Sequence, residues 1–423
     1  MAPARRHSAA VLDADVLVIG GGMVGLTLAV ALGGAGLEVV VVDRADPKSQ
    51  VAAAFDGRTS AIAHGSKRAL EAIDLWPAMA PDAEPILDIR VSDGASPLFL
   101  HYDHREVGDA PLGYIIENRA TRHALFFRVG NLDGVTLKAP MSVASLEAKA
   151  GAVEAVLGDG TTVRASLAVG ADGPRSWVRR QAGIALAEWR YKQTGIVCTM
   201  AHERPHRGIA HERFLPAGPF AVLPMTDDAS VAAGRLGRFR SSIVWTERED
   251  LAPAMLALDD AAFSDELAAR FGDYYGTVRV AGPRWSYPLA LHHAESYVAP
   301  RLALIGDAAH LIHPIAGQGL NLGLRDVAAL AEALIDAARL GLDIGGADVL
   351  QRYQRWRRFD NTVLIAATDG LNRLFSNDVP AVRLVRDLGL GAVNRVPPVK
   401  RFFMRHAMGV VGELPRLLRG EAL

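Results

Sequence analysis

Two runs, Leu302-Ala303-Leu304-Ile305-Gly306-Asp307-Ala308-Ala309-His310 and His313-Pro314-Ile315-Ala316-Gly317-Gln318-Gly319-Leu320-Asn321, decide the fold of this chain. The four apolar residues at the start indicate a buried strand, and Gly306-Asp307 indicates the tight turn that ends it. The second run is a glycine loop that opens an amphipathic helix, because apolar residues recur at helical spacing over residues 320–334. Strand, turn and helix in this order are typical of an α/β fold.

The first turn of the helix that opens near Gln318 is expected to bind a ligand. A helix N-terminus carries unpaired backbone N–H groups and a partial positive charge. Gly317 and Gly319 lack the side chains that would keep a planar ligand away from the backbone. We therefore expect an anionic or electron-rich group against the backbone of residues 317–321.

A second glycine turn lies near the N-terminus, between two apolar segments. Residues 15–19 and 39–42 are predicted strands, and residues 26–35 are a predicted helix. The turn Gly20-Gly21-Gly22-Met23-Val24-Gly25 has the spacing of the dinucleotide fingerprint, in which the glycines allow a tight turn, approach to a pyrophosphate and close packing. Asp43, after the second strand, can accept hydrogen bonds from an adenosine ribose. The motif alone does not separate FAD from NAD.

Composition and charge narrow the class of protein. The chain has 423 residues, half of them hydrophobic, which suggests two or three structural units with a substantial core. A formal net charge of -1 argues against a nucleic-acid binder. The single cysteine, Cys198, fits a reducing compartment, and no Cys/His cluster has metal-ligand spacing, so we expect no metal.

A signal peptide or membrane span is the alternative interpretation of residues 16–37, which carry no charge. Asp13 and Asp15 precede the stretch, and seven glycines lie inside it. Neither feature suits a helix that crosses a bilayer, so we interpret the stretch as part of a βαβ unit.

Two further segments bear on the ligand. Asp56-Gly57-Arg58 precedes a helix predicted over residues 61–79 with Ser60 as its cap, and Arg58 is either a surface arginine or a contact to phosphate or the flavin edge. The apolar residues 167–171 end at Asp172-Gly173. That pair is either a plain turn or a turn that orders the loops beside a dinucleotide.

The order and spacing of the glycine fingerprint, Asp172-Gly173 and Gly306-Asp307 are similar to those of the single-component FAD-dependent aromatic hydroxylases, the group of p-hydroxybenzoate hydroxylase. The run from His313 to Asp326 resembles the signature of one branch, the UbiH-type ubiquinone-biosynthesis hydroxylases. Asp56-Gly57-Arg58, residues 113–122 and residues 414–420 are also similar to that branch. The likeness covers nearly the whole chain. One departure is Asp43, where the group more often has glutamate.

The resemblance implies an α/β fold in which a Rossmann-like FAD-binding domain and a β-sheet substrate domain are interleaved and a helical C-terminal segment follows. The FAD-binding domain would comprise residues 10–80, 110–190 and 295–345. The substrate domain would comprise residues 81–109 and 191–294, and the helical region residues 346–423. In the substrate domain we expect strands over residues 195–200, 220–225 and 242–246 and a helix over 260–271. Its candidate pocket residues are Phe214, Phe220, Leu223, Trp245 and Tyr287, most of which we expect to be ordinary core.

The resemblance also implies a set of FAD contacts. The fingerprint and Asp43 would hold the ADP half, Asn118 or Arg122 the middle, Asp307 the ribityl chain or pyrophosphate, and the backbone of residues 317–321 the isoalloxazine ring. The predicted cofactor-binding residues are Gly20, Gly22, Met23, Val24, Gly25, Asp43, Arg44, Arg58, Asn118, Arg122, Asp172, Gly306, Asp307, Gly317, Gln318, Gly319, Leu320 and Asn321. Asp307 has the alternative of only capping the next turn, and His310 is expected to be a packed, hydrogen-bonded histidine.

The implied activity is hydroxylation of the ring of a polyprenylated phenol in ubiquinone biosynthesis, using NAD(P)H and O2 through a C4a-hydroperoxyflavin. His313, Pro314 and Gln318 are the candidate catalytic residues, shaping the oxygen and substrate side. No second glycine fingerprint follows a strand, so NAD(P)H is expected to bind transiently. The alternatives are a related flavoprotein reductase or dehydrogenase, and a non-enzymatic dinucleotide-binding component of a quinone-synthesis complex.

The C-terminal region is predicted to be helical over residues 361–375 and 382–418. The second of these segments mixes many arginines with Phe402, Phe403 and Met404. Such a segment either rests on an anionic bilayer or a partner protein, or is the solvated face of a packed helix. We therefore expect a cytoplasmic protein, with peripheral contact to the inner face of the membrane and to other ubiquinone-biosynthesis proteins as open options.

Overall fold

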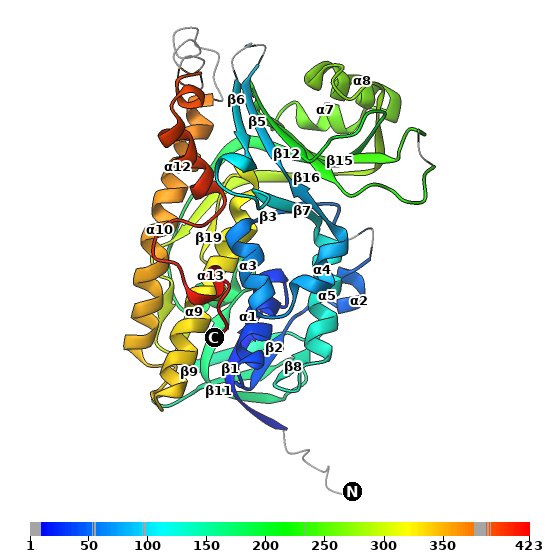
Figure 1. The fold of residues 1–423 in the computed structure, drawn as a ribbon. Helices are drawn as coiled ribbons and strands as arrows, with labels where there is room; N and C mark the ends of the chain where they lie inside the picture. The colour runs from blue at the N-terminus through cyan, green and yellow to red at the C-terminus, as the bar shows by residue number, and fades with distance from the viewer. Residues whose placement is uncertain are drawn as a thin grey trace, which may run out of the picture.

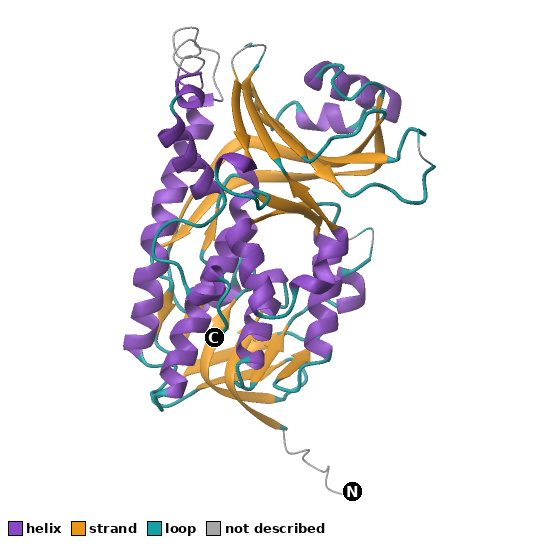
Figure 2. Ribbon diagram, viewed as in Figure 1, coloured by secondary structure: helices purple, strands orange, loops and turns teal. Residues whose placement is uncertain are grey.

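The structure is a computed structural model that describes residues 10–423 apart from 53, 55, 95, 97, 98, 233, 376–385, 387, 388 and 390. In this described part the strands form three sheets. Helices pack around the sheet at the bottom of Figure 1, and a second large sheet lies above it (Figures 1 and 2). The predicted α/β class is confirmed.

The first sheet carries both predicted glycine bends. β1 (Val11–Ile19) pairs in parallel with β2 (Val39–Val42) and with β11 (Thr162–Gly170), and β11 pairs in parallel with β18 (Leu302–Leu304). Because these strands run in one direction, the ends of β1 and β18 that lead into the two bends lie at the same edge of the sheet. The remaining strands of this sheet are β8 (Val135–Lys138), β9 (Val143–Ala148), β10 (Val153–Leu157) and β17 (Val298–Ala299).

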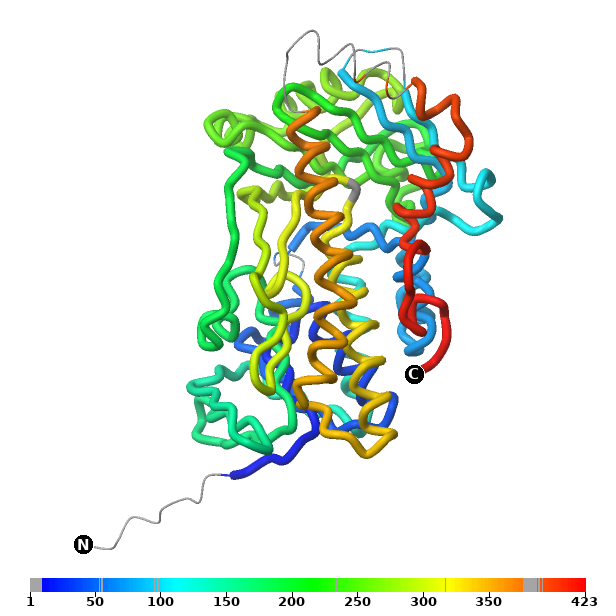
Figure 3. The backbone as a smooth tube through the Cα atoms, turned by 90° about the vertical axis from the view of Figure 1, so that its left-hand side faces the viewer, coloured from blue at the N-terminus to red at the C-terminus, as the bar shows by residue number. Residues whose placement is uncertain are grey.

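Helices from distant parts of the chain cover this sheet. α1 (Met23–Gly34) packs against α5 (Asn118–Gly130) and α9 (Gln318–Arg339), and α10 (Ala347–Phe375) packs against α9. α10 runs along one side of the molecule (Figure 3). The shorter helices are α2 (Pro47–Gln50), α3 (His64–Ala72), α4 (Trp76–Met79), α6 (Trp177–Gln181) and α13 (Arg416–Arg419).

The second sheet is largely antiparallel and follows the order β19-β16-β12-β15-β14-β13-β5-β6. Short helices α7 (Ala252–Leu256) and α8 (Asp260–Phe271) lie on its outer side (Figure 1). Its strands are β5 (Asp88–Asp93), β6 (Phe99–Asp103), β12 (Leu186–His202), β13 (Ile209–Leu215), β14 (Gly218–Met225), β15 (Phe239–Arg248), β16 (Val278–Ala294) and β19 (His310–Leu311).

A three-stranded sheet joins the two large ones and corrects one prediction. β3 (Thr59–Ala63) pairs with β7 (Gly113–Glu117), which also pairs with β4 (Ala83–Ile86). The start of the helix predicted over residues 61–79 and its cap Ser60 are wrong, because β3 occupies residues 59–63; the rest of the range holds two helices, α3 and α4. Ser60 instead donates a hydrogen bond to Asn118 Oδ1 at 2.6 Å. Pairing with β7 outweighs the helical pattern of the local sequence.

The C-terminal region is helical where it is described. The helix predicted over residues 361–375 is the second half of α10, and α12 (Pro397–Ala407) falls within the segment predicted over 382–418. Most of residues 382–390 lie outside the described residues. Among the described helices, none combines the length and the apolar character that crossing a membrane requires.

Candidate functional site

In the turn between β1 and α1, two glycines pack against backbone so closely that no side chain would fit, and a third glycine faces open space. Gly20 has a φ of +114°, and a Cβ built on it would overlap the backbone of Ala171, just after β11. A Cβ on Gly25 would overlap the carbonyl oxygen of Gly20. A Cβ on Gly22 would meet no atom within 4 Å. The turn therefore has room for a ligand at Gly22, where the fingerprint predicts a pyrophosphate.

Asp43 is fixed beside this turn. The backbone N–H of Gly21 donates to Asp43 Oδ2 at 2.5 Å, and that of Ala45 donates to Oδ1 at 2.6 Å. Each carboxylate oxygen can accept a further hydrogen bond, so contact with a ribose remains a prediction that this geometry allows. Arg44, the next residue, is exposed.

The second bend lies directly against the first. Gly306 has a φ of +58°, and a Cβ built on it would lie 3.3 Å from the side chain of Val24 in the first turn of α1. A Cβ on Gly323, in α9, would lie 2.6 Å from Val24 Cγ2. Val24 is therefore enclosed by the second bend and α9. One extended ligand can contact both glycine bends.

Asp307 follows in the 3-10 turn η3 (Gly306–Ala308) and has no hydrogen-bond or ion-pair partner among the described residues. Burial raises its pKa, while the nearby His310 and Arg58 act in the opposite direction. An enclosed carboxyl group without a protein partner needs a ligand or water to satisfy it. The hydroxyl groups of a ribityl chain have the required hydrogen-bond donors.

The first turn of α9 follows the 3-10 turn η4 (Ile315–Gly317) and lies against β3. Gly317 has a φ of +62°, and a Cβ built on it would lie 2.8 Å from the Cβ of Ala61. Asn321 Nδ2 donates to the carbonyl oxygen of Ala61 at 2.8 Å, and Asn321 Oδ1 accepts from the N–H of Ala63 at 2.9 Å. A Cβ on Gly319 would meet no described atom within 4 Å. Asn321 thus holds this turn in place, and Gly319 leaves room beside it.

Three predicted cofactor residues meet on one buried carboxylate, Asp56. Arg58 Nε, Arg122 Nη2 and Asn118 Nδ2 donate to it at 2.9, 2.7 and 3.2 Å. Burial would raise the pKa of Asp56, but the hydrogen bonds and charge of Arg58, helped by Arg122, hold it well below its usual range. The guanidinium of Arg58 also lies 4.6 Å from the ring centroid of Tyr287, in the second sheet. The cluster therefore joins the cofactor region to the substrate sheet.

A second buried carboxylate, Asp326, positions the Gly306 bend. It accepts hydrogen bonds from Gly306 N at 3.0 Å, His310 Nε2 at 2.5 Å and Arg357 Nε at 2.9 Å. Burial opposes ionisation, but the charges of His310 and Arg357 lower the pKa of Asp326 to about 2. His310 is thus the packed, hydrogen-bonded histidine that was expected. Sequence reasoning missed Asp326 and Arg357 as positioning residues, because nothing in their spacing links α9 to α10.

The candidate catalytic residues lie where β19 leads into α9. His313 is fully buried, its ring centroid lies 5.1 Å from that of Tyr191, and neither ring nitrogen has a hydrogen-bond partner among the described residues. Burial lowers the pKa of His313 to about 4, so it is neutral at physiological pH. Pro314 precedes η4 and Gln318 begins α9. Their catalytic roles remain predictions.

Three other predicted cofactor residues are held by the protein itself. Asp172 caps α6, because Oδ1 accepts from Ser176 Oγ at 2.5 Å and Oδ2 from Trp177 N at 2.7 Å. Met23 and Leu320 are partly buried against the core of the first sheet. The carboxylate of Asp172 therefore orders the turn after β11, and its place beside a dinucleotide remains a prediction.

The candidate pocket residues lie on two different faces of the second sheet. On the face that we call inner, Thr59 Oγ1 donates to Ser242 Oγ at 2.9 Å, and Tyr287 lies under Arg58. Phe214 and Leu223 share this face. Phe220 and Trp245 do not, because they are fully buried on the outer face against Phe263 of α8. Their proposed place in the pocket wall is wrong, since strand alternation points them away from the cofactor region.

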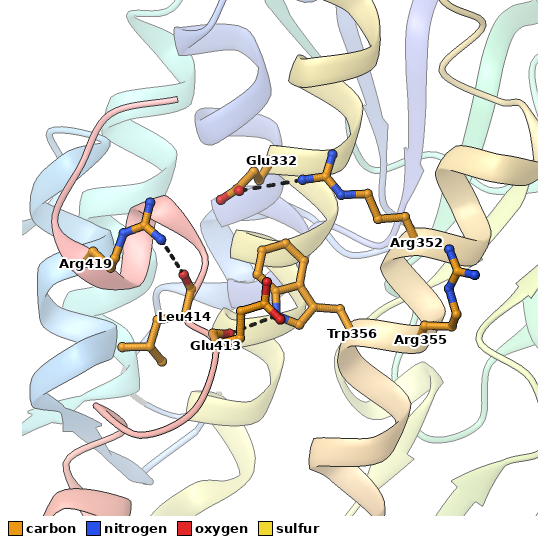
Figure 4. Close-up of a pocket in the computed structure, with 7 residues that line it drawn as sticks. All are labelled: Glu332, Arg352, Arg355, Trp356, Glu413, Leu414 and Arg419. Atoms are coloured by element: carbon orange, nitrogen blue, oxygen red, sulfur yellow. Dashed lines mark hydrogen bonds and ion pairs between the residues drawn. The ribbon is translucent and has the colours of Figure 1, made fainter.

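Figure 4 shows a surface pocket near the C-terminus. It is formed by α9, α10 and the C-terminal segment, and the indole of Trp356 donates to the carbonyl oxygen of Glu413 at 2.8 Å (Figure 4). None of the residues predicted to bind FAD lines it. Within the described residues, no group of His, Cys, Asp and Glu side chains could hold a metal ion.

Comparison with known proteins gives consistent matches over the whole length. A family model described as FAD binding domain matches residues 13–362. The ubiquinone hydroxylase UbiL of Rhodospirillum rubrum is 54% identical over 413 residues, covering 97% of this chain and 94% of that protein. The 3-demethoxyubiquinol 3-hydroxylase of Escherichia coli is 34% identical over 400 residues, covering 94% and 98%. Among solved structures, P. aeruginosa PqsL in complex with 2-aminobenzoylacetate has a TM-score of 0.75 at 22% identity, covering 91% and 100%, which shows the shared fold.

Proposed function

Because the chain belongs to the FAD-binding-domain family, with ubiquinone hydroxylases among its members, we propose that it hydroxylates the aromatic ring of a polyprenylated phenol. FAD is the cofactor, NAD(P)H is the reductant and O2 supplies the oxygen atom. The relatives named as ubiquinone hydroxylases support the substrate class. Their coverage of nearly the whole chain extends the argument from the cofactor domain to the substrate sheet.

The observation that carries the proposal is the meeting of the two glycine bends at Val24. Gly22 and Gly319 each leave open space, while Gly20, Gly25 and Gly317 are closed against backbone or side chains. This pattern suits an extended dinucleotide whose pyrophosphate meets one bend and whose ring meets the other.

The protein's own groups would bind and orient the cofactor. Bound FAD supplies the redox chemistry and the activation of oxygen. The N-terminal end of α9 would stabilise negative charge on the pyrimidine edge of the ring without a charged side chain. The carboxyl group of Asp307 would accept hydrogen bonds from the ribityl chain, and Arg58 and Arg122, held by Asp56, would contact the middle of the cofactor.

Oxygen uptake by the purified, FAD-loaded protein tests this function. With NADH or NADPH and a short-chain 2-prenylphenol, we expect oxygen consumption and a product heavier by one oxygen atom in mass spectrometry. A related reductase would oxidise NAD(P)H without adding oxygen to the phenol. A non-enzymatic component of a complex would show no substrate-dependent NAD(P)H oxidation. Either of the last two results would overturn the proposal.

The same proposal gives α12 a role at the membrane, where a polyprenylated phenol resides. Phe402 and Phe403 are 55% and 45% exposed on this helix, and Arg401 and Arg405 beside them are also exposed. No acidic residue lies within α12. Exposed aromatic rings interleaved with cations fit an anionic lipid surface. The helix would rest on such a bilayer and deliver the phenol to the sheet behind it.

Co-sedimentation with vesicles of phosphatidylglycerol and phosphatidylcholine tests this contact. The double variant Phe402→Ser, Phe403→Ser should bind about tenfold more weakly, because two apolar anchors are lost. Phe127→Ser is the matched control, because Phe127 is 69% exposed on α5. Equal binding by the double variant and the wild type would refute the contact and leave a partner protein as the occupant of this surface.

A further inference from the structure

Glu212 lies on the inner face of the substrate sheet. Side chains of β13 alternate between the two faces. His211 is on the outer face, with its ring centroid 5.1 Å from that of Phe271 in α8. Phe214 is on the inner face, where it shares a buried cluster with Ile315 of η4. Glu212, one residue after His211 and two before Phe214, therefore points to the side that meets the loop before α9.

The cross-strand row that contains Glu212 is otherwise apolar. In register, the row reads Leu100, Val91, Glu212, Ala221, Val244, Val197 and Trp285. At its end, Trp285 packs against Gly57, next to the Asp56–Arg58 cluster, because a Cβ on Gly57 would overlap the indole. A carboxyl group at the centre of such a row costs free energy unless something satisfies it.

Nothing in the described part of the protein satisfies Glu212. Its side chain is surrounded by protein but only half-buried, and it makes no hydrogen bond or ion pair with any described residue. The other carboxylates buried between sheets and helices have arginine partners, as Asp56 has Arg58 and Asp326 has Arg357. Asp307, at the proposed cofactor site, is the comparable unpaired group. A half-buried, unpaired carboxyl group in an apolar row beside the proposed cofactor region is a candidate ligand contact.

Charged neighbours do not account for the raised pKa of Glu212. The titratable or charged side chains on the same face and on the loop and helix that face it include Asp93, Arg386, Tyr102, Arg58, Tyr287, Arg240 and His313, and Arg240 lies 3.7 Å from Glu117. Asp93 is paired with Arg386 at 2.9 Å, and Arg58 with Asp56 at 2.9 Å. Burial alone raises the pKa of Glu212 to about 7. The group therefore exchanges a proton in the physiological range.

We propose that Glu212 is a catalytic residue that binds the hydroxyl group of the phenolic substrate and accepts its proton. The inference rests on the proposed ring hydroxylation. The O–H bond of the phenol breaks, the proton bonds to a carboxylate oxygen of Glu212, and the electron pair stays on the phenol oxygen. No electron leaves the substrate in this step. The resulting phenolate has a more electron-rich ring for the attack on oxygen, and the proton returns to the product oxygen before release.

Contact between Glu212 and the phenol can be measured without turnover. A short-chain 2-prenylphenol is titrated into the FAD-loaded protein at pH 8 in the absence of NAD(P)H, and the ultraviolet difference spectrum is recorded. The wild type should show the red-shifted absorption of a phenol that donates a hydrogen bond to a carboxylate, and Glu212→Gln should lose this shift. Glu249→Gln is the matched control, because Glu249 is exposed in the turn after β15. An equal shift in Glu212→Gln would overturn the proposal.

Kinetics provide the second readout. The base must be ionised, so the wild-type rate of hydroxylation should fall as the pH drops below about 7, the pKa of Glu212. Glu212→Gln should lose this acidic limb and about a hundredfold in kcat/KM. Glu212→Asp keeps a carboxylate and should retain the acidic limb, which also carries the test if Glu212→Gln folds poorly. An unchanged acidic limb in Glu212→Gln would contradict the assignment.

The proposed function and this inference fail in different ways. A wild type that binds FAD but adds no oxygen to a prenylphenol refutes the function. A wild type that hydroxylates the phenol, together with a Glu212→Gln variant of equal kcat/KM and equal difference spectrum, refutes only the role of Glu212. A merely structural Glu212 would produce this second outcome.

Discussion

The two regions that meet at the proposed active site are built in different ways. Around Val24, the backbone decides the geometry, because glycines at the two bends are either closed against the protein or open to a ligand. On the inner face of the second sheet, side chains decide the geometry. There, Glu212 is the one carboxyl group in a cross-strand row of apolar residues. Contacts made by backbone leave a glycine pattern in the sequence. Contacts made by side chains depend on strand register, which the sequence does not display.

The largest effect on stability is expected from a substitution in the buried network that fixes the cofactor region. Asp326→Asn removes the charge that pairs with the fully buried Arg357, so the free energy of unfolding should fall by about 3–5 kcal/mol. Urea denaturation measures this change. Asp133→Asn is the control, because Asp133 is exposed. A loss below about 1 kcal/mol in Asp326→Asn would mean that α10 does not hold the second bend.

The pH dependence of the same network sharpens this test. The pKa of Asp326 is lowered from 3.8 to about 2 in the folded protein, so its contribution to stability is present above pH 4 and is lost as the pH falls toward 2. Denaturation curves recorded between pH 5 and pH 2 should therefore converge for the wild type and Asp326→Asn. Parallel curves would show that the ionised carboxylate is not the stabilising group.

A pair of phenylalanine variants compares the two faces of the substrate sheet. Phe220→Ala and Phe214→Ala each remove a buried ring, and each should lower the free energy of unfolding by about 3 kcal/mol. Their kinetics should differ, because only Phe214 lies on the inner face beside Ile315. At a temperature where both variants are folded, Phe214→Ala should raise KM for the phenol and Phe220→Ala should not. Equal KM values would refute the division into faces.

The sequence predicted the glycine bends and most strands and helices better than the contacts between side chains, for a physical reason. The fingerprint, the strand over residues 39–42 and the glycine loop before α9 each depend on local spacing, and each lies where expected. The helix expected over residues 61–79 starts too early, because β3 gains its stability from β7 and Asn321, which are distant in the chain. Phe220 and Trp245 were assigned to the wrong face, since aromatic character does not reveal strand phase. The roles of Asp326 and Glu212 could not be predicted, because they depend on tertiary contacts: Asp326 pairs with Arg357, and Glu212 has no partner among the described residues.

Two glycines in the first turn of α9 give a smaller contrast. Gly317→Ala places a side chain in the left-handed region and against Ala61, so it should destabilise the protein by about 1–2 kcal/mol. Gly319→Ala meets open space in a helix and should stabilise the FAD-free protein by about 0.5–1 kcal/mol. If the flavin ring lies there, Gly319→Ala should nevertheless weaken FAD binding. Thermal unfolding with and without FAD separates the two effects, and unchanged FAD affinity in Gly319→Ala would place the ring elsewhere.

The FAD content of purified Gly22→Asp tests the central claim most directly. A Cβ at Gly22 meets open space, so folding should survive, while the added bulk and negative charge occupy the place of the pyrophosphate. Gly34→Ala is the control, because Gly34 ends the same helix and also faces open space. We expect the wild type and Gly34→Ala to carry one FAD per chain and Gly22→Asp to be folded and colourless. A yellow Gly22→Asp protein at full FAD occupancy would contradict the claim that the two glycine bends hold the cofactor.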